Sequence, residues 1–167
     1  MISIIVAVSD DWGIGKDNEL LWRISEDLKR FKRLTMGKSV IMGKKTWESL
    51  PTRPLPGRKN IVLTDVPHEQ IEGAITVYSI DEALSKCIEG EEVFIMGGGS
   101  VYRQFMPFAG RLYITHVCRN APADIYFPPI DMDVWKITEE EDFPESETNV
   151  TPYRYVIYER KSNVINN

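Results

Sequence analysis

The sequence predicts a three-layer α/β fold: a central, mostly parallel, twisted sheet of about eight strands, with an antiparallel C-terminal edge strand and about four flanking helices. Two observations predict it. Over the first two thirds of the chain, short apolar strands alternate with helical segments, which implies right-handed crossovers and a parallel sheet covered on both faces. In the last third, three strand-like segments follow one another without a helical pattern between them, which is typical of antiparallel pairing.

Length and composition fit one compact domain. The chain has 167 residues, of which 43% are hydrophobic and 27% are charged, and this is enough to form one core. We expect a single domain over residues 1–161 and a frayed tail over residues 162–167. The formal net charge of -5 argues against a surface that binds nucleic acid.

The sequence favours a cytoplasmic protein. The apolar run at residues 1–9 is too short to span a bilayer, and no charged segment precedes it as in a secretory signal. Cys87 and Cys118 lack the spacing of metal ligands, and we expect both to be reduced. We therefore expect neither a membrane nor a metal as a partner.

The first quarter of the chain contains a strand, a long loop and a helix. Residues 2–9 are continuously apolar and rich in β-branched side chains, which predicts a central strand covered on both faces. Residues 10–24 show no periodicity, and we interpret them as a lid or pocket wall because loops of this length usually serve function. A helix is predicted from Ser25, where apolar residues begin to recur at helical spacing, and Gly37 ends it.

The remaining elements follow in regular order. Further strands are predicted at residues 39–43, 60–64, 74–78 and 92–96, and helices at residues 44–50, 80–88 and 100–106. The three C-terminal strands are predicted at residues 111–118, 135–141 and 153–161. Ligands of such sheets bind at the carboxyl ends of the strands, so the turns after Ser9, Met42 and Met96 should line one cleft.

Two of these turns have features of phosphate sites. Gly97-Gly-Gly-Ser100 places several unobstructed N–H groups at a helix start, although such glycines also serve close packing, and the spacing is not that of a Rossmann fingerprint. Gly43-Lys-Lys-Thr46 adds two ammonium groups and a hydroxyl at another helix start. Adjacent lysines also suit a solvated surface, but here they oppose the helix dipole, which favours an anionic ligand. Two such sites suit a dinucleotide with an extra phosphate.

Asp27 is the candidate acid. In the first turn of its helix it fits a capping role, which acids often have there. It also borders the apolar helix face, where a carboxylate needs hydrogen-bond donors from a ligand such as a flat amidine-like edge.

Together with several other motifs, these residues resemble the bacterial-type dihydrofolate reductases along nearly the whole chain. The matching stretches are Ile14-Gly15 and Trp22, Asp27 with Phe31-Lys-Arg33, Val40-Ile-Met-Gly43, Thr46-Trp-Glu-Ser49, Arg53-Pro-Leu-Pro-Gly-Arg-Lys-Asn60, Gly97-Gly-Gly99 with Val101-Tyr102, and Leu112-Tyr-Ile-Thr-His116.

The resemblance implies a substrate site for dihydrofolate. Asp27 would pair with the pterin amino and ring nitrogen donors, with Thr115 and a water held by Trp22 completing the network. Arg58 would bind the α-carboxylate of the glutamate tail through a bidentate fork. The slot would be lined by Ile5, Ala7, Leu28, Phe31, Leu50 and Met96.

The resemblance also implies NADPH as cofactor. Lys44, Lys45 and Thr64 would lie near its 2′-phosphate and select it over NADH. A cis peptide is implied between Gly97 and Gly98. The implied cofactor-binding residues are Ala7, Ile14, Gly15, Leu20, Gly43, Lys44, Lys45, Thr46, Leu63, Thr64, Gly97, Gly98, Gly99, Ser100, Val101 and Tyr102.

The implied reaction is hydride transfer from the nicotinamide to pterin C6, with a proton reaching N5 through water, in support of one-carbon metabolism. Three residues depart from the commoner family pattern. Leu21 replaces a proline and Arg23 replaces a small amide, both in the expected lid, and Lys44 replaces an arginine. These departures bear on lid dynamics and cofactor affinity rather than on the chemistry.

Two alternatives remain at this point: a reductase of similar architecture acting on a pyrimidine of flavin synthesis, and a nucleotide-binding protein without catalysis. Asp27, Trp22 and Arg58 favour the dihydrofolate reaction over the first. We assign no catalytic role to His68 or His116. We expect a monomer, since no long apolar stripe is left over once the core is assigned. The resemblance also implies binding of antifolate inhibitors.

Overall fold

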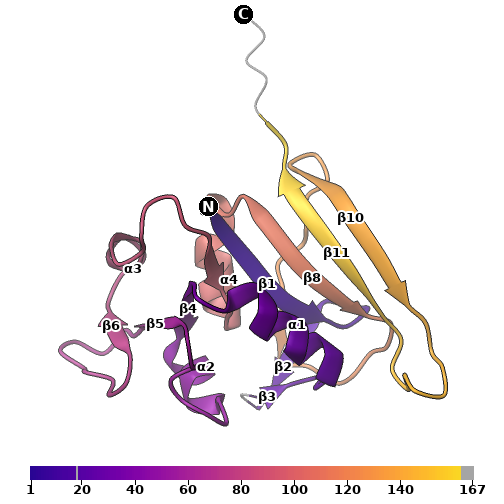
Figure 1. Ribbon diagram of the computed structural model, residues 1–167, viewed down its shortest axis with the longest axis horizontal. Helices are drawn as coiled ribbons and strands as arrows, with labels where there is room; N and C mark the ends of the chain where they lie inside the picture. The colour runs from indigo at the N-terminus through magenta and orange to yellow at the C-terminus, as the bar shows by residue number, and fades with distance from the viewer. Residues whose placement is uncertain (18, 163–167) are drawn as a thin grey trace, which may run out of the picture.

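The computed structural model describes residues 1–17 and 19–162, so the predicted frayed tail lies outside the described residues except for Ser162. Its main sheet consists of β1 (Ile2–Val8), β4 (Ser39–Gly43), β5 (Lys59–Leu63), β6 (Ile75–Val77), β7 (Val93–Ile95), β8 (Arg111–Val117), β10 (Trp135–Phe143) and β11 (Tyr153–Arg160). These eight strands lie in the order β10-β11-β8-β1-β7-β4-β5-β6, and Figure 1 shows the twist of this sheet. The predicted α/β sheet is confirmed.

The sheet is parallel from β6 to β8 and antiparallel beyond. β1 pairs in parallel with both β7 and β8, and β4 pairs in parallel with β5 and β7. β11 pairs antiparallel with β8 on one side and with β10 on the other. The last strand, β11, is antiparallel to its neighbours as predicted. It is not the edge strand, because β10 pairs with its outer side and forms the edge of the sheet.

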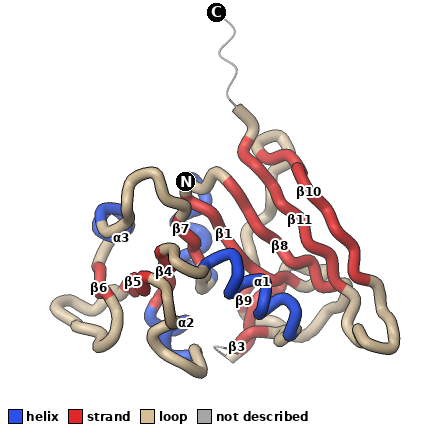
Figure 2. Tube along the Cα trace, viewed as in Figure 1, coloured by secondary structure: helices blue, strands red, loops and turns tan. Residues whose placement is uncertain are grey.

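Four α-helices flank the sheet: α1 (Ser25–Thr35), α2 (Lys44–Ser49), α3 (Ile80–Ser85) and α4 (Gly99–Phe105), the last followed by the 3-10 helix η1 (Met106–Phe108). In Figures 1 and 2, α1 lies on the near side of the sheet and α4 on the far side. The predicted helix over residues 80–88 ends at Ser85, and the helix predicted from Ser25 begins there as α1.

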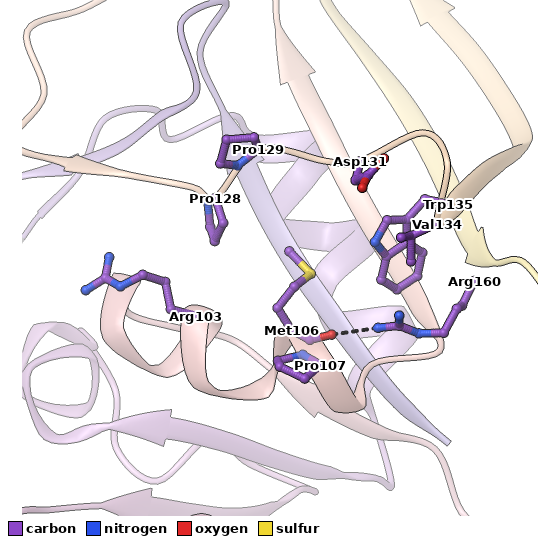
Figure 3. A pocket seen from close by; sticks show the side chains of 9 residues that line it. All are labelled: Arg103, Met106, Pro107, Pro128, Pro129, Asp131, Val134, Trp135 and Arg160. Carbon is purple, nitrogen blue, oxygen red and sulfur yellow. Dashed lines mark hydrogen bonds between the residues drawn. The ribbon is translucent and has the colours of Figure 1, made fainter.

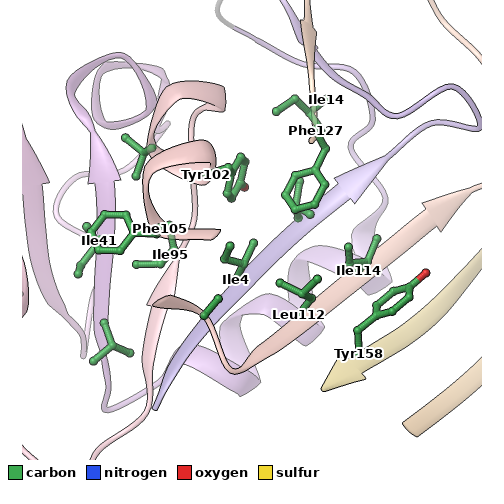
Figure 4. Close-up of a cluster of buried hydrophobic side chains, with 14 of the residues drawn as sticks. Ile4, Ile14, Ile41, Ile95, Tyr102, Phe105, Leu112, Ile114, Phe127 and Tyr158 are labelled. Carbon is green, nitrogen blue, oxygen red and sulfur yellow. The ribbon is translucent and has the colours of Figure 1, made fainter. Parts of the chain in front are cut away.

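Strand β4 shows how one apolar run serves two cores. Val40 and Met42 belong to the cluster that contains Trp47 of α2, whereas Ile41 between them belongs to the cluster that contains Phe105 of α4. All three strand residues are fully buried, because side chains alternate across a strand and both faces of this sheet are covered. Figure 4 shows the second cluster, in which Ile41 and Phe105 meet.

The segment predicted as a loop over residues 10–24 contains two short strands. β2 (Gly13–Lys16) pairs antiparallel with β3 (Glu19–Leu20) and with β9 (Ile125–Tyr126), so the prediction of an unstructured loop is wrong here. Strands of two to four residues are too short for a periodic sequence signal, and β9 lies more than a hundred positions away. No helix of the described residues has the length and apolarity of a membrane span.

His116 on β8 is a packing residue at the edge of the core. Its Nε2 lies 2.9 Å from the hydroxyl of Tyr158, and the ring of Trp12 meets it edge-on at 5.2 Å between centroids. Burial lowers the pKa of His116 to about 4, and the charge of Arg154 acts in the same direction. The imidazole is therefore neutral in the folded protein at physiological pH.

The neutral His116 makes stability depend on pH. Because its pKa is lower in the folded state than in the unfolded state, its contribution is complete above the ordinary histidine pKa and is lost as the pH falls from about 6.5 to about 4. We expect the free energy of unfolding to fall by less than about 3 kcal/mol, because the ring is only partly buried. Urea unfolding at several pH values across this range measures the dependence of this free energy on pH. His116→Gln should make that dependence weaker, and the exposed His68→Gln should not. The same dependence in the wild type and both variants would contradict the assignment.

Candidate functional site

A cleft of about 1080 Å³ opens where β1, β4 and β7 end at their carboxyl termini. Helices α1, α2 and α4 and strands β2, β3 and β9 contribute to its walls. Every residue that the sequence predicted for substrate or cofactor binding lines this cleft. Residues from nine different elements and their turns are therefore brought to one place, as expected at the carboxyl edge of a parallel sheet.

Asp27 lies in this cleft and is held by β8. The hydroxyl of Thr115 donates a hydrogen bond to Oδ1 of Asp27 at 2.6 Å. The N-cap of α1 has no side-chain hydrogen bond, so the capping role considered for this acid is not what the structure shows. The carboxylate instead points from the first turn of α1 towards the sheet.

The Asp27 carboxyl is partly buried in the cleft wall. Burial raises the pKa of the Asp27 carboxyl above its ordinary value, and the hydrogen bond from Thr115 and the charge of Arg30 offset part of this rise. Trp22 lines the same cleft, and its indole N–H is buried and finds no acceptor among the described residues. A desolvated carboxylate and a buried donor without a partner both favour a polar ligand or a water in this cleft.

Arg30 is a site residue that the sequence analysis missed. Its guanidinium lies 3.9 Å from the ring centroid of Tyr155 and lines the cleft. It follows Asp27 by three residues, so helical spacing places both on one face of α1, and this signal could have identified it. Tyr155 lies on β11, and no local pattern points to its contact with α1.

Arg58 lines the cleft and is held in place by two acceptors. Its Nε donates to the carbonyl of Pro56 at 3.0 Å, and its Nη1 donates to the hydroxyl of Thr35 at 3.2 Å. Its guanidinium also lies 5.9 Å from the ring of Phe31. These bonds use two of the five N–H donors of an arginine, so an anionic ligand can accept from the others.

The two glycine turns meet at the cleft. The N–H of Gly43 donates to the carbonyl of Gly97 at 2.8 Å, and the peptide between Gly97 and Gly98 is cis, as the family resemblance predicted. A Cβ on Gly99 would lie only 2.6 Å from the side chain of Ile125, so the close approach of α4 to β9 requires glycine. Neither α2 nor α4 has a side-chain cap, and their first-turn N–H groups remain available to a ligand.

The predicted phosphate end of the cleft holds an ion pair. Nζ of Lys44 lies 2.7 Å from Oε2 of Glu69, and the hydroxyl of Thr64 donates to the other oxygen at 3.2 Å. This pairing raises the pKa of Lys44 and lowers that of Glu69, chiefly through their shared hydrogen bond. Glu69 was not among the predicted site residues, because nothing local connects it to a lysine 25 positions away.

A second, smaller pocket of about 380 Å³ lies between α4, η1 and β10 (Figure 3). Arg160 donates to the carbonyls of Met106 and Ala109 and lies 4.6 Å from the ring of Trp135. The guanidinium of Arg160 thus joins structural elements to one another. This pocket lacks the glycine turns and the acid of the main cleft. The main cleft is therefore the candidate site.

Burial of Asp27 should cost stability. A carboxyl whose pKa is raised in the folded state favours folding only when protonated, so the charged form destabilises the protein at neutral pH. We expect Asp27→Asn to raise the free energy of unfolding near pH 7 by on the order of 1 kcal/mol, with the gain shrinking as the pH falls through the raised pKa of Asp27 towards the ordinary carboxyl value, where it vanishes. Denaturant unfolding measures it, with Glu26→Gln, an exposed acid of the same turn, as control. A loss of stability in Asp27→Asn at pH 7 would contradict this account.

Comparison with known proteins identifies the family. A family model described as dihydrofolate reductase matches residues 1–160. The dihydrofolate reductase of Bacillus subtilis (strain 168) is 41% identical over 162 residues, covering 97% of this chain and 96% of that protein, and that of Neisseria gonorrhoeae is 45% identical over 157 residues, covering 94% and 96%. The solved structure of dihydrofolate reductase from Enterococcus faecalis, complexed with NADP(H) and RAB-propyl, matches with a TM-score of 0.89 at 33% identity over 97% of each chain. The chain belongs to the dihydrofolate reductase family.

Proposed function

We propose that the cleft reduces 7,8-dihydrofolate to 5,6,7,8-tetrahydrofolate with NADPH, and that Asp27 orients the substrate. The reaction is that of the family to which the chain belongs over its full length. The observation that carries the assignment of the site is the buried Asp27 carboxylate, fixed by Thr115 at 2.6 Å inside the cleft. A pterin offers this carboxylate the donors that burial has taken from it.

The substrate is bound at both ends. Asp27 accepts from the 2-amino group and ring nitrogen of the pterin, and Trp22, whose indole N–H is buried, holds a water beside it. Apolar side chains enclose the ring between these groups and the tail. Arg58 binds the α-carboxylate of the glutamate tail with the donors that Pro56 and Thr35 leave unused. The lining side chains are Ile5, Ala7, Leu28, Phe31, Leu50 and Met96.

The cofactor occupies the other part of the cleft. When bound, NADPH supplies the hydride. The turns at Gly43 and at Gly97 to Gly99 suit its phosphates, because they bring two uncapped helix starts within one hydrogen bond of each other. We assign Lys44, Lys45 and Thr64, which line the cleft, to the 2′-phosphate that distinguishes NADPH from NADH. The other residues proposed for the cofactor are Ala7, Ile14, Gly15, Leu20, Thr46, Leu63, Ser100, Val101 and Tyr102.

The chain contributes alignment and exclusion of water rather than a nucleophile. Asp27 holds the pterin by the edge remote from N5, so the proton reaches N5 through water. Leu20 and Trp22, from the segment between β1 and α1, line the cleft and would cover the reacting rings. The same proposal includes antifolate binding at the Asp27 site, a single domain over residues 1–161, a monomer, and a cytoplasmic location.

Turnover tests the proposal. The wild type should consume NADPH when dihydrofolate is added, and this is measured as the loss of nicotinamide absorbance. NADH should be a poor hydride donor in the same assay. Asp27→Asn keeps the shape but not the charge, and we expect kcat/KM to fall about 100-fold or more. Glu26→Gln, on the same helical turn, should leave it unchanged. A wild type that binds NADPH without consuming it would instead support the non-catalytic alternative.

The role of Arg58 has its own test. Arg58→Lys keeps the charge but loses the planar fork, so we expect KM for dihydrofolate to rise about tenfold with little change in kcat. A dihydropterin without the glutamate tail should show no such difference between the two proteins. If the substitution impaired both substrates equally, Arg58 would act on the fold or the ring and not on the tail.

A further inference from the structure

We propose that Glu69 is a specificity-determining residue that competes with the 2′-phosphate of the cofactor for Lys44 and Thr64, and so weakens the preference for NADPH over NADH. This inference rests on the proposed cofactor site. It concerns a residue outside the matching motifs, in the segment between β5 and β6.

The contacts of Glu69 are those expected of a phosphate. One carboxylate oxygen lies 2.7 Å from the ammonium of Lys44, and the other accepts from the hydroxyl of Thr64 at 3.2 Å. A phosphate monoester would offer the same two partners an anionic oxygen each. One carboxylate thus occupies two of the three residues proposed to recognise the extra phosphate, and of the three only Lys45 makes no hydrogen bond to it in the described part of the chain.

Glu69 is held close to this position by its own segment. Its side chain is 20% exposed, against 39% for Lys44, so the more enclosed partner is the acid. The hydroxyl of Tyr78 donates to the main-chain carbonyl of Glu69, and Tyr78 itself lines the cleft. The main chain of Glu69 is therefore anchored to a residue of the cleft wall, and its carboxylate contacts two further wall residues, Lys44 and Thr64.

The electrostatic consequence follows from the charges. Lys44 carries one positive charge, and Glu69 cancels it at short range. Asp65, which lies on the cleft wall, adds a second negative charge that acts on Lys44. A phosphate that binds here must displace Glu69 from Lys44 or share the lysine with it, and either costs affinity. NADH, which has no 2′-phosphate, does not meet this competition.

The experiment compares Glu69→Gln with the wild type and with Glu72→Gln, which removes an exposed acid from the same segment. Glutamine keeps the length of the side chain and the main-chain acceptor for Tyr78. Dissociation constants are measured for NADPH and NADH, and for 2′,5′-ADP and 5′-AMP, which differ only in the 2′-phosphate and take no part in turnover. Unfolding curves confirm that each variant is folded, and Glu69→Ala provides a second variant.

We expect Glu69→Gln to tighten binding of NADPH and of 2′,5′-ADP about threefold to tenfold, as for loss of one partly exposed opposing charge, with less than a twofold change for NADH and 5′-AMP. Glu72→Gln should change all four by less than a factor of two. Unchanged binding of NADPH and 2′,5′-ADP, the two ligands with a 2′-phosphate, in Glu69→Gln and Glu69→Ala would overturn the proposal. Weaker binding of these ligands would also overturn it, because Glu69 would then position Lys44 for the phosphate.

The same measurements separate this inference from the proposed cofactor site. If the wild type fails to prefer 2′,5′-ADP over 5′-AMP, the proposed phosphate site is in question. A preference that appears only in Glu69→Gln would then support competition by Glu69. Absence of a preference in both proteins would overturn both assignments.

Discussion

The parallel pairing of β1 between β7 and β8 is the constraint on which the site depends. In this register Ala7 lies beside Thr115, and Ile4 lies beside both Ile95 and Leu112. Thr115 therefore faces α1, where Asp27 accepts its hydrogen bond, while its neighbour Ile114 is buried in the opposite core. A slip of one residue would turn Thr115 to the other face, away from Asp27, and would place the apolar Ile114 on the face that now carries the hydroxyl.

The site carries costs that the core has to offset. The Asp27 carboxylate is partly buried, and among the described residues it has the Thr115 hydroxyl as its donor while the buried N–H of Trp22 has no acceptor. Both costs are relieved when a ligand supplies the missing partners, which is how a binding site differs from a well-satisfied core. The continuous apolar packing on both faces of β4 and β1 supplies the stability that makes such a site tolerable.

Charge at the two ends of the cleft is arranged differently. At the end proposed for the substrate, Arg58 is held by an aromatic ring and neutral acceptors, and Arg30, near Asp27, lies over the ring of Tyr155. At the end proposed for the cofactor, Lys44 is already paired with Glu69. The family pattern assigns Lys44 to a phosphate but does not reveal this difference between the two ends. The difference depends on the ion pair of Lys44 with Glu69, which joins two separate segments of the chain.

Features that depend on neighbouring residues could be predicted from the sequence. The run at residues 39–43 is β4 with the predicted bounds, and apolar spacing after Ser25 predicted α1, because strand and helix periodicities are local. Family motifs brought Asp27, Arg58 and the glycine turns into the predicted site. The pairing of β2 with β9, the position of Arg30 over the ring of Tyr155 and the contact of Glu69 with Lys44 became visible in the folded chain. Each of these joins residues from separate segments, and such contacts leave no trace in local composition or spacing since they exist only once the chain has folded.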